Sequence, residues 1–134
     1  MLSIKPEFAE KIFSGEKRFE FRKTCFKEDV RVVLVYVTMP VGKIVGEFKI
    51  DRIFAHDPSQ LWEITKKFAG VTHDSFNEYF SGRDVGYAIK IKEARRYRVA
   101  KDPYVEEPNF IPPQSFRYLR SERYVSHQPS LALI

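Results

Sequence analysis

A glycine and three charged residues occur at close spacing near the start of the chain, in the pattern Gly15-x-Lys17-x-x-Glu20-x-Arg22. The glycine allows a sharp turn, and the charged side chains then leave one turn and one face of a strand. A carboxylate between two cations can form ion pairs with both, so that the cluster needs no ligand. It also offers donors and an acceptor to a nucleobase or a phosphate. From the residues alone, both interpretations stay open.

A second basic cluster occupies residues 90–98, KIKEARRYR. Its cations are Lys90, Lys92, Arg95, Arg96 and Arg98. The chain carries a net charge of +5, and the charges of residues 101–134 cancel, so the excess lies before residue 101. Such a stripe, with Tyr97 interleaved, is typical of surfaces that contact nucleic-acid phosphates. It is equally typical of a solvated edge strand whose cations discourage edge-to-edge pairing.

Several other chemistries find no support. His56, His73 and His127 lie far apart and lack companions at metal-ligand spacing, so we expect no metal and no cofactor. Cys25 is the single cysteine, which leaves no intramolecular disulfide and favours a packing role for its thiol. The sequence contains no P-loop, no dinucleotide-binding glycine motif and no nucleophile elbow.

The elements beside the motif are a helix and a strand. Pro6 suits a first helical turn, the apolar residues that follow share one face, and Gly15 ends the helix. The stretch KRFEFR then alternates, which places Phe19 and Phe21 on one side of a strand and the charges on the other. We therefore expect buried phenylalanines and charges that open on a cleft.

The remaining elements predict an α+β fold. Residues 30–38 read as a strand buried on both faces, and residues 43–55 as a strand with Gly46 at a bulge. Asp57 and Thr72 are suited to cap two helices, whose aromatic residues we interpret as core, and residues 84–92 form a further strand. We expect a small mixed sheet that curls into a barrel, flanked by short helices.

The composition changes after residue 100, so we assign a domain to residues 1–100 and a C-terminal extension to residues 101–134. Residues 103–119 are rich in proline and predict an extended strap, and residues 120–134 predict a loose tail that can dock a protein partner. In PPQSFRYL, aromatic residues can anchor the strap. We predict that Gln114, Ser115 and Arg117 help to close the cleft of Lys17 and Glu20.

No apolar run is long enough to cross a bilayer, and the first residues lack the apolar core and cleavage site of a signal peptide. We therefore expect a cytoplasmic protein without membrane contact.

The stretch SIKPEFAEKIFSGEKRFEFRK resembles the opening of the ASCH domain, a branch of the PUA-like superfamily. The similarity continues through PVGKIVGEF and DVGYAIKI, and PPQSFRYL resembles a C-terminal extension of a bacterial and phage subgroup. The family's hallmark positions fall on Gly15, Lys17, Glu20 and Arg22. The resemblance implies a β-barrel with a cleft beside the first helix and binding of RNA or a nucleotide, with a regulatory role in RNA metabolism or transcription.

Under this interpretation Lys17, Glu20 and Arg22 bind the ligand, and the 90–98 stripe contacts the nucleic-acid backbone. Two alternatives stay open. The first is a metal-independent enzyme that uses Lys17 and Glu20, either a ribonuclease or an amidohydrolase of acetylated cytidine. Family members with the latter activity have a threonine nucleophile where this chain has Glu20, and Thr24 lies too far along the strand to replace it. The second alternative is a protein-interaction adaptor that acts through the tail.

Overall fold

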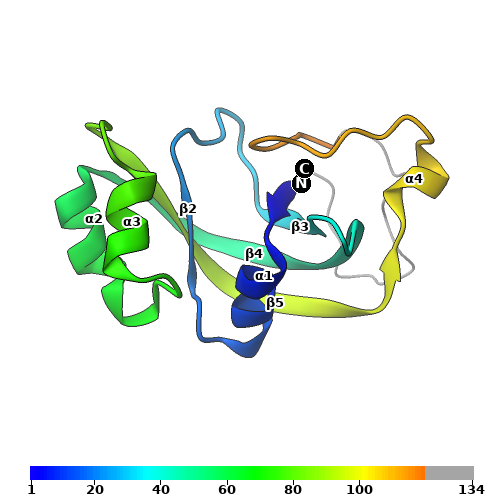
Figure 1. Ribbon diagram of the computed structural model, residues 1–134, viewed down its shortest axis with the longest axis horizontal. Coiled ribbons are helices and arrows are strands. Elements are labelled where there is room, and N and C mark those ends of the chain that lie inside the picture. Colours follow the sequence, from blue (N-terminus) through cyan, green and yellow to red (C-terminus); the bar gives the residue numbers. More distant parts are fainter. Residues whose placement is uncertain (120–134) are drawn as a thin grey trace.

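The computed structural model describes residues 1–119, along which strands and short helices alternate (Figure 1). The first elements are β1 (Leu2–Ile4), α1 (Pro6–Ser14), β2 (Phe19–Arg22), β3 (Val32–Val37) and β4 (Lys43–His56). They are followed by α2 (Pro58–Thr65), the 3-10 helix η1 (Lys66–Phe68), α3 (His73–Tyr79), β5 (Gly86–Lys101) and α4 (Pro103–Glu106). The predicted succession of helix, strands, helical excursion and strand is confirmed. The short β1 and α4 were not predicted, and β5 continues to Lys101, beyond the predicted end at residue 92.

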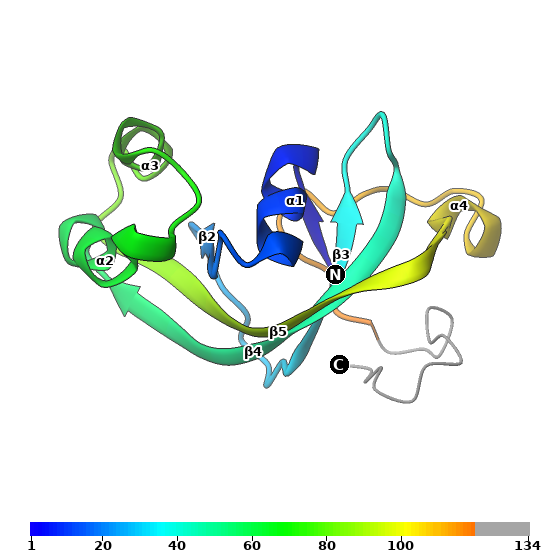
Figure 2. The same cartoon turned by 90° about the horizontal axis from the view of Figure 1, so that it is seen from below.

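The strands form one five-stranded sheet in the order β1-β3-β4-β5-β2. Strand β1 runs parallel to β3, and the other neighbours are antiparallel. The two longest strands, β4 and β5, curve together along the molecule (Figure 2). The α+β class and the mixed sheet are confirmed. In the described residues the sheet does not close into the expected barrel, because α1 lies between its edge strands β1 and β2 (Figure 2).

Strand β3 lies in the interior of the sheet, between β1 and β4, and every residue from Val32 to Val37 is buried. Its continuous run of apolar residues therefore matches burial on both faces, as predicted. The bulge predicted at Gly46 is also present, since the β4–β5 register shifts between Ile44 and Gly46. A Cβ at Gly46 would lie 2.4 Å from the Arg95 carbonyl oxygen and 2.6 Å from the Phe13 ring, so only glycine fits there.

The predicted capping residues begin the helices of the excursion. The Asp57 side chain accepts a hydrogen bond from the Gln60 N–H at 3.1 Å, and the Thr72 hydroxyl accepts one from the Ser75 N–H at 3.1 Å. These bonds satisfy amide groups that the first helical turn leaves free. In the part of the chain that the structure describes, no helix has the length and apolar character needed to cross a membrane.

The helical excursion packs on β2 through an aromatic cluster. Phe21 meets Phe76 edge to face at 5.1 Å between ring centroids, and Phe76 meets Phe80 at 4.8 Å. Phe19, Phe21, Phe76 and Phe80 are all buried in this cluster. The helix aromatics therefore act mainly as core, as expected, and they fix α3 beside the motif strand.

The segment after α4 runs along the first residues of the chain. Leu2 and Phe116 form an isolated antiparallel bridge, and the Arg117 N–H donates to the Met1 carbonyl at 3.0 Å. The Ser3 hydroxyl donates to the Pro113 carbonyl at 2.6 Å. The Phe116 ring packs edge to face on Phe26 at 5.0 Å. Residues 103–119 thus contain one short helix, and residues 113–117 lie along β1, whereas the predicted tail, 120–134, lies outside the described residues.

Candidate functional site

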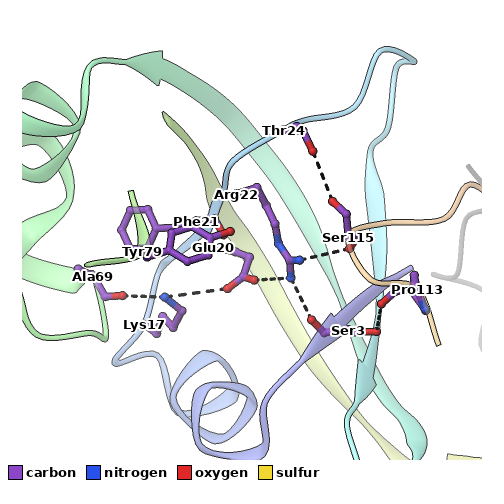
Figure 3. A network of polar contacts seen from close by, with 10 residues as sticks. All are labelled: Ser3, Lys17, Glu20, Phe21, Arg22, Thr24, Ala69, Tyr79, Pro113 and Ser115. Atoms are coloured by element: carbon purple, nitrogen blue, oxygen red, sulfur yellow. Dashed lines mark hydrogen bonds and ion pairs between the residues drawn. The ribbon is translucent and has the colours of Figure 1, made fainter. Parts of the chain in front are cut away.

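A pocket of about 590 Å³ lies beside β2. Residues of β1 and α1 line one side, α3 and the loop before it line the other, and β2 lies between them (Figure 3). The charged residues that line it are Lys5, Lys17, Glu20, Arg22 and Glu78. The structure therefore brings the three charged residues of the sequence motif to one cavity, and we refer to Lys17, Glu20 and Arg22 as the charged row.

The short strand β2 presents the row as the alternation of its sequence predicts, with one difference. Phe19 and Phe21 are buried, and Glu20 and Arg22 face the pocket. Phe21 also borders the cavity. Because α1 and α3 cover this edge strand from both sides, Glu20 is itself only 7% exposed. The charges therefore open on a cleft and not on free solvent.

Lys17 is the most deeply buried member of the charged row, with 2% of its surface exposed. Its Nζ donates to the Ala69 carbonyl at 2.8 Å and lies 4.7 Å from the centre of the Phe21 ring. Burial is the main cause that lowers the pKa of Lys17 from 10.5 to about 8; Glu20 opposes this shift, and Arg22 and Lys11 add to it. Near neutral pH this lysine can therefore carry or release a proton.

Gly70 makes room for the stem of Lys17. Its φ of +70° is a backbone conformation that favours glycine, and an added Cβ would lie 2.5 Å from both Cβ and Cγ of Lys17. The residue reads in the sequence as the end of a helix, and nothing near it indicates a partner 53 positions earlier. In loop 69–71, the Ala69 carbonyl therefore binds the ammonium of Lys17, and the absence of a side chain at Gly70 leaves space for the methylene groups of Lys17.

Glu20 lies between the two cations of the charged row (Figure 3). Its Oε2 accepts from Arg22 Nη2 at 2.6 Å, and its Oε1 lies 4.0 Å from Lys17 Nζ. The first contact is a short charge-assisted hydrogen bond, and the second is longer than a hydrogen bond. The carboxylate is therefore firmly paired on the arginine side and only electrostatically attracted on the lysine side.

Arg22 ties the pocket to two other segments. Its Nη2 donates to the Ser3 carbonyl at 3.0 Å, and its Nη1 donates to the Ser115 carbonyl at 3.2 Å. Its Nε is buried and has no hydrogen-bond partner among residues 1–119. A buried donor without a partner is costly and uncommon in folded proteins. Arg22 therefore links β1 to the strap, and it also has hydrogen-bond donors that residues 1–119 do not use.

The three strap residues predicted to close the cleft lie in different places. Ser115 meets the charged row through its backbone carbonyl, and its hydroxyl lies 3.5 Å from that of Thr24. Arg117 instead forms two hydrogen bonds to Glu107, at 2.8 and 2.9 Å. None of the three predicted residues, Gln114, Ser115 and Arg117, lines the pocket. Alternation along an extended chain turns Gln114 away from Ser115, and Arg117 is held elsewhere by its ion pair with Glu107.

Helix α3 contributes pocket residues that the sequence did not single out, namely Ser75, Glu78 and Tyr79. The Tyr79 hydroxyl donates to the Phe21 carbonyl at 3.3 Å, and Lys23 Nζ lies 4.8 Å from its ring centre. Burial is the main cause that raises the pKa of Tyr79. Tyr79 is one of the helix aromatics that the sequence predicts as core, but it lies beside Glu78 at the surface of α3 and is 38% exposed.

The 90–98 stripe lies on β5, away from the charged row. Strand β2 pairs with β5 only as far as Lys90, so the residues beyond it have β4 as a neighbour on one side and form an edge. Lys90, Arg95 and Arg96 pair with Asp51, Glu47 and Glu10 at 3.5, 3.0 and 3.0 Å. Lys92 and Arg98 are exposed and form no ion pair with residues 1–119. Two of the five predicted backbone-contacting cations thus keep their charge uncompensated.

The histidines take part in packing where the structure describes them. His73 stacks on Trp62 with ring centroids 4.5 Å apart, and His56 stacks on Phe54 at 6.4 Å. Within residues 1–119, no three His, Cys, Asp or Glu side chains come together in a way that could hold a metal ion. The thiol of Cys25 is partly buried, and burial is the main cause that raises its pKa.

Comparison with known proteins places the chain in a family. The model of the ASCH domain matches residues 2–104. A crystal structure of ASCH from Zymomonas mobilis has 29% identity and a TM-score of 0.84, and it covers 91% of this chain and 87% of that one. This agreement confirms the expected PUA-like fold.

Among curated proteins, an ASCH domain-containing ribonuclease of Zymomonas mobilis is 30% identical over 125 residues, which span 91% of this chain and 84% of that protein. The large ribosomal subunit protein uL22 of Ureaplasma parvum is 34% identical over 122 residues, which cover 90% of this chain and 39% of that protein. The chain therefore matches well under half of that ribosomal protein. By the family model and by the Zymomonas mobilis relative, the chain belongs to the ASCH domain family.

Proposed function

We propose that this protein binds RNA and takes one unpaired nucleotide into the pocket beside β2. The observation that supports this proposal most directly is the charged row: the buried Lys17 and Glu20 and the partly buried Arg22 line one cavity of about 590 Å³. This volume lies within the range of small-ligand sites and suits a nucleoside or nucleotide. A role in RNA metabolism or transcription would follow from such binding.

The lining of the pocket combines features that nucleic-acid sites use. Phe8, Phe76 and Tyr79 offer aromatic surface to a base, and Lys5 adds a positive charge. Lys92 and Arg98 on β5 are available for phosphates of the neighbouring nucleotides. One relative, which this chain matches over most of that protein's length, is named as a ribonuclease, and this supports RNA as the ligand.

The depth of the charged row favours single-stranded RNA. Lys17 is 2% exposed and Glu20 7% exposed, so a base inside a duplex cannot reach them without leaving its stack. Extracting a paired base costs a few kcal/mol, whereas an unpaired base pays much less. We therefore expect single strands to bind more tightly than duplexes of the same sequence.

A binding titration with a fluorescent single-stranded RNA of mixed sequence tests the proposal. Lys17→Met should weaken binding at least about tenfold, because a buried ammonium and its charge-assisted contacts are lost. Binding by the wild type should weaken as the pH rises through about 8, where Lys17 loses its charge, and Lys17→Met should lack this dependence. Arg31→Ala, which removes an exposed cation paired with Asp29, serves as the control. If neither single-stranded nor duplex RNA binds the wild type, the proposal is wrong.

RNA cleavage is a second candidate function, and the relative named as a ribonuclease favours it. Cleavage without a metal proceeds when a ribose 2′-oxygen forms a bond to the adjacent phosphorus and the bond to the 5′-oxygen breaks. A base must take the 2′-proton, and an acid must supply a proton to the leaving oxygen. Lys17, with its pKa of about 8, can exchange a proton near neutral pH.

Incubation with RNA in EDTA distinguishes cleavage from binding. Cleavage by this route yields a 2′,3′-cyclic phosphate and a 5′-hydroxyl, and a 2′-deoxy substitution at the cut position should abolish it. Acetylated cytidine in the same buffer tests the amidohydrolase alternative. Intact RNA and intact acetylated cytidine after prolonged incubation would leave binding as the function.

A further inference from the structure

The charged row keeps hydrogen-bonding capacity on each of its members. An ammonium has three donors, and Lys17 uses one on the Ala69 carbonyl. A guanidinium has five; Arg22 uses three, on Ser3, Glu20 and Ser115, and since Nε is buried, its second Nη1 donor is the one left for a ligand. Glu20 Oε1 accepts no hydrogen bond from any side chain or amide of residues 1–119. Each member can therefore still bind a ligand.

The free groups occur in a fixed order along the pocket. Lys17 offers donors at one end, Glu20 Oε1 offers an acceptor in the middle, and Arg22 offers donors at the other end (Figure 3). The ion pairs set this order, since the carboxylate lies 4.0 Å from the ammonium on one side and 2.6 Å from the guanidinium on the other. The protein thus presents a donor, an acceptor and a donor in sequence.

We infer that the pocket recognises the uracil base. The edge of uracil presents O2, N3–H and O4, an acceptor, a donor and an acceptor, which complements the charged row group for group. Lys17 and Arg22 donate to the two carbonyl oxygens, and Glu20 accepts from N3–H. This inference rests on the proposed function, because it assumes that a nucleotide enters the pocket.

The other RNA bases do not match this order. Cytosine would place the lone pair of N3 against the Glu20 carboxylate, and guanine would place an amino donor against one of the cations. Adenine offers an amino donor beside a single ring acceptor and leaves one cation without a partner. In a buried site each such mismatch leaves a polar group unpaired, which is the strongest basis for discrimination between similar ligands.

The sides of the pocket suit a flat ring held by its polar edge. Ile4, Phe8, Val71 and Phe76 supply apolar surface around the charged row. A pyrimidine ring can bury its faces against such groups while its edge reaches Lys17, Glu20 and Arg22. The apolar sides therefore contribute affinity for any base, and the charged row discriminates between the bases.

Ligands that differ in a single hydrogen-bonding group test the inference on the unmodified protein. The titration compares uridine, 3-methyluridine and cytidine, and separately the hexanucleotides of U, C and A. Uridine should bind at least about tenfold more tightly than 3-methyluridine, in which the N3 donor is replaced by a methyl group, and tenfold more tightly than cytidine. The U hexamer should show the same preference. Uridine binding alone would assign a free nucleoside as ligand, and binding of the hexamer alone would assign RNA.

Glu20→Gln provides the matching protein variant, with the exposed Glu16→Gln as its control. Glu20→Gln should reduce the preference for uridine over 3-methyluridine to within about threefold, and Glu16→Gln should leave it unchanged. Equal binding of the U, C and A hexamers by the wild type would overturn the base assignment and leave RNA binding intact. If no nucleoside and no hexamer binds, the proposed function itself fails.

Discussion

The two basic clusters of this protein look alike in sequence and differ completely in the fold. The charged row pairs Lys17 and Arg22 with a carboxylate in a pocket, where their side chains are 2% and 11% exposed. The cations of the β5 stripe form their ion pairs at the surface, where the side chains of Lys90 and Arg96 are 43% and 45% exposed. Burial strengthens electrostatic interactions and makes unpaired groups costly, whereas solvent screens the exposed pairs. The difference shows that burial, and not basic composition, distinguishes a specific site from a general charged surface.

Removal of one arginine from each cluster should show the largest contrast. Arg22→Ala leaves Glu20 buried beside only a distant lysine and frees the Ser3 and Ser115 carbonyls, so the free energy of unfolding should fall by about 3 to 5 kcal/mol. Arg96→Ala breaks a pair with the exposed Glu10 and should cost less than about 1 kcal/mol. Urea unfolding measures both. Equal losses would show that Arg22 is not held as the structure describes.

Substitutions at two glycines with similar backbone conformations separate the effect of packing against Lys17 from the effect of the backbone. Gly70 and Gly82 have φ of +70° and +77°, but an added Cβ meets Lys17 at 2.5 Å in the first case and nothing within 4 Å in the second. Both substitutions to alanine carry a backbone cost of about 1 to 2 kcal/mol. Gly70→Ala should lose about 1 to 3 kcal/mol more from overpacking.

The same pair of glycine variants also tests function. Gly70→Ala should weaken RNA binding, because the displaced lysine no longer aligns with Glu20, and Gly82→Ala should bind as the wild type does. Thermal unfolding and the RNA titration measure the two effects. Similar results for both variants would mean that the loop before α3 does not position Lys17.

The pKa of Lys17 predicts how the stability of the charged row depends on pH. In the folded protein this pKa is lowered from 10.5 to about 8, so between these values the unfolded chain holds more protons and the free energy of unfolding rises with pH. Lys17→Met lacks this titration, so the free energy of unfolding of the wild type should rise by about 1 to 3 kcal/mol relative to that of Lys17→Met between pH 7 and pH 10. A constant difference in urea unfolding between pH 7 and 10 would contradict the lowered pKa.

The smallest expected effect concerns the β5 stripe. If Lys92 and Arg98 contact phosphates, the double variant to alanine should reduce the dependence of log affinity on log salt by roughly 0.7 for each contact. Its free energy of unfolding should change by less than about 0.5 kcal/mol, because both side chains are exposed. An unchanged salt dependence would show that the stripe does not contact phosphates and is only the solvated edge of β5.

The sequence predicted the parts of the site that local pattern controls. The turn at Gly15 and the alternation in FEFR are properties of neighbouring residues, so the common location of Lys17, Glu20 and Arg22 could be inferred from spacing. The caps at Asp57 and Thr72 were recognisable for the same reason.

The rest of the site depends on contacts between distant segments, which local pattern does not encode. Gly70 reaches Lys17, and Tyr79 reaches the Phe21 carbonyl, only because the aromatic cluster docks the helical excursion on β2. Barrel closure likewise depends on where α1 packs between the edge strands. The prediction for Arg117 failed for the same reason. Its place near Ser115 in the sequence suggested a role in the pocket, but in the fold its guanidinium pairs with Glu107.

The bridge between Leu2 and Phe116 has a consequence for how the protein is made. The side chains of Ser3 and Arg22 donate hydrogen bonds to the carbonyls of Pro113 and Ser115, so some of the last described residues hold the charged row in place. Contacts across such long stretches of chain form slowly, and during translation they must wait for the later segment. The match to the family model ends at residue 104 and does not include this later segment. A nascent chain that has emerged only to that point therefore already carries the complete Gly15–Arg22 motif, while Arg22 still lacks the strap that orients it.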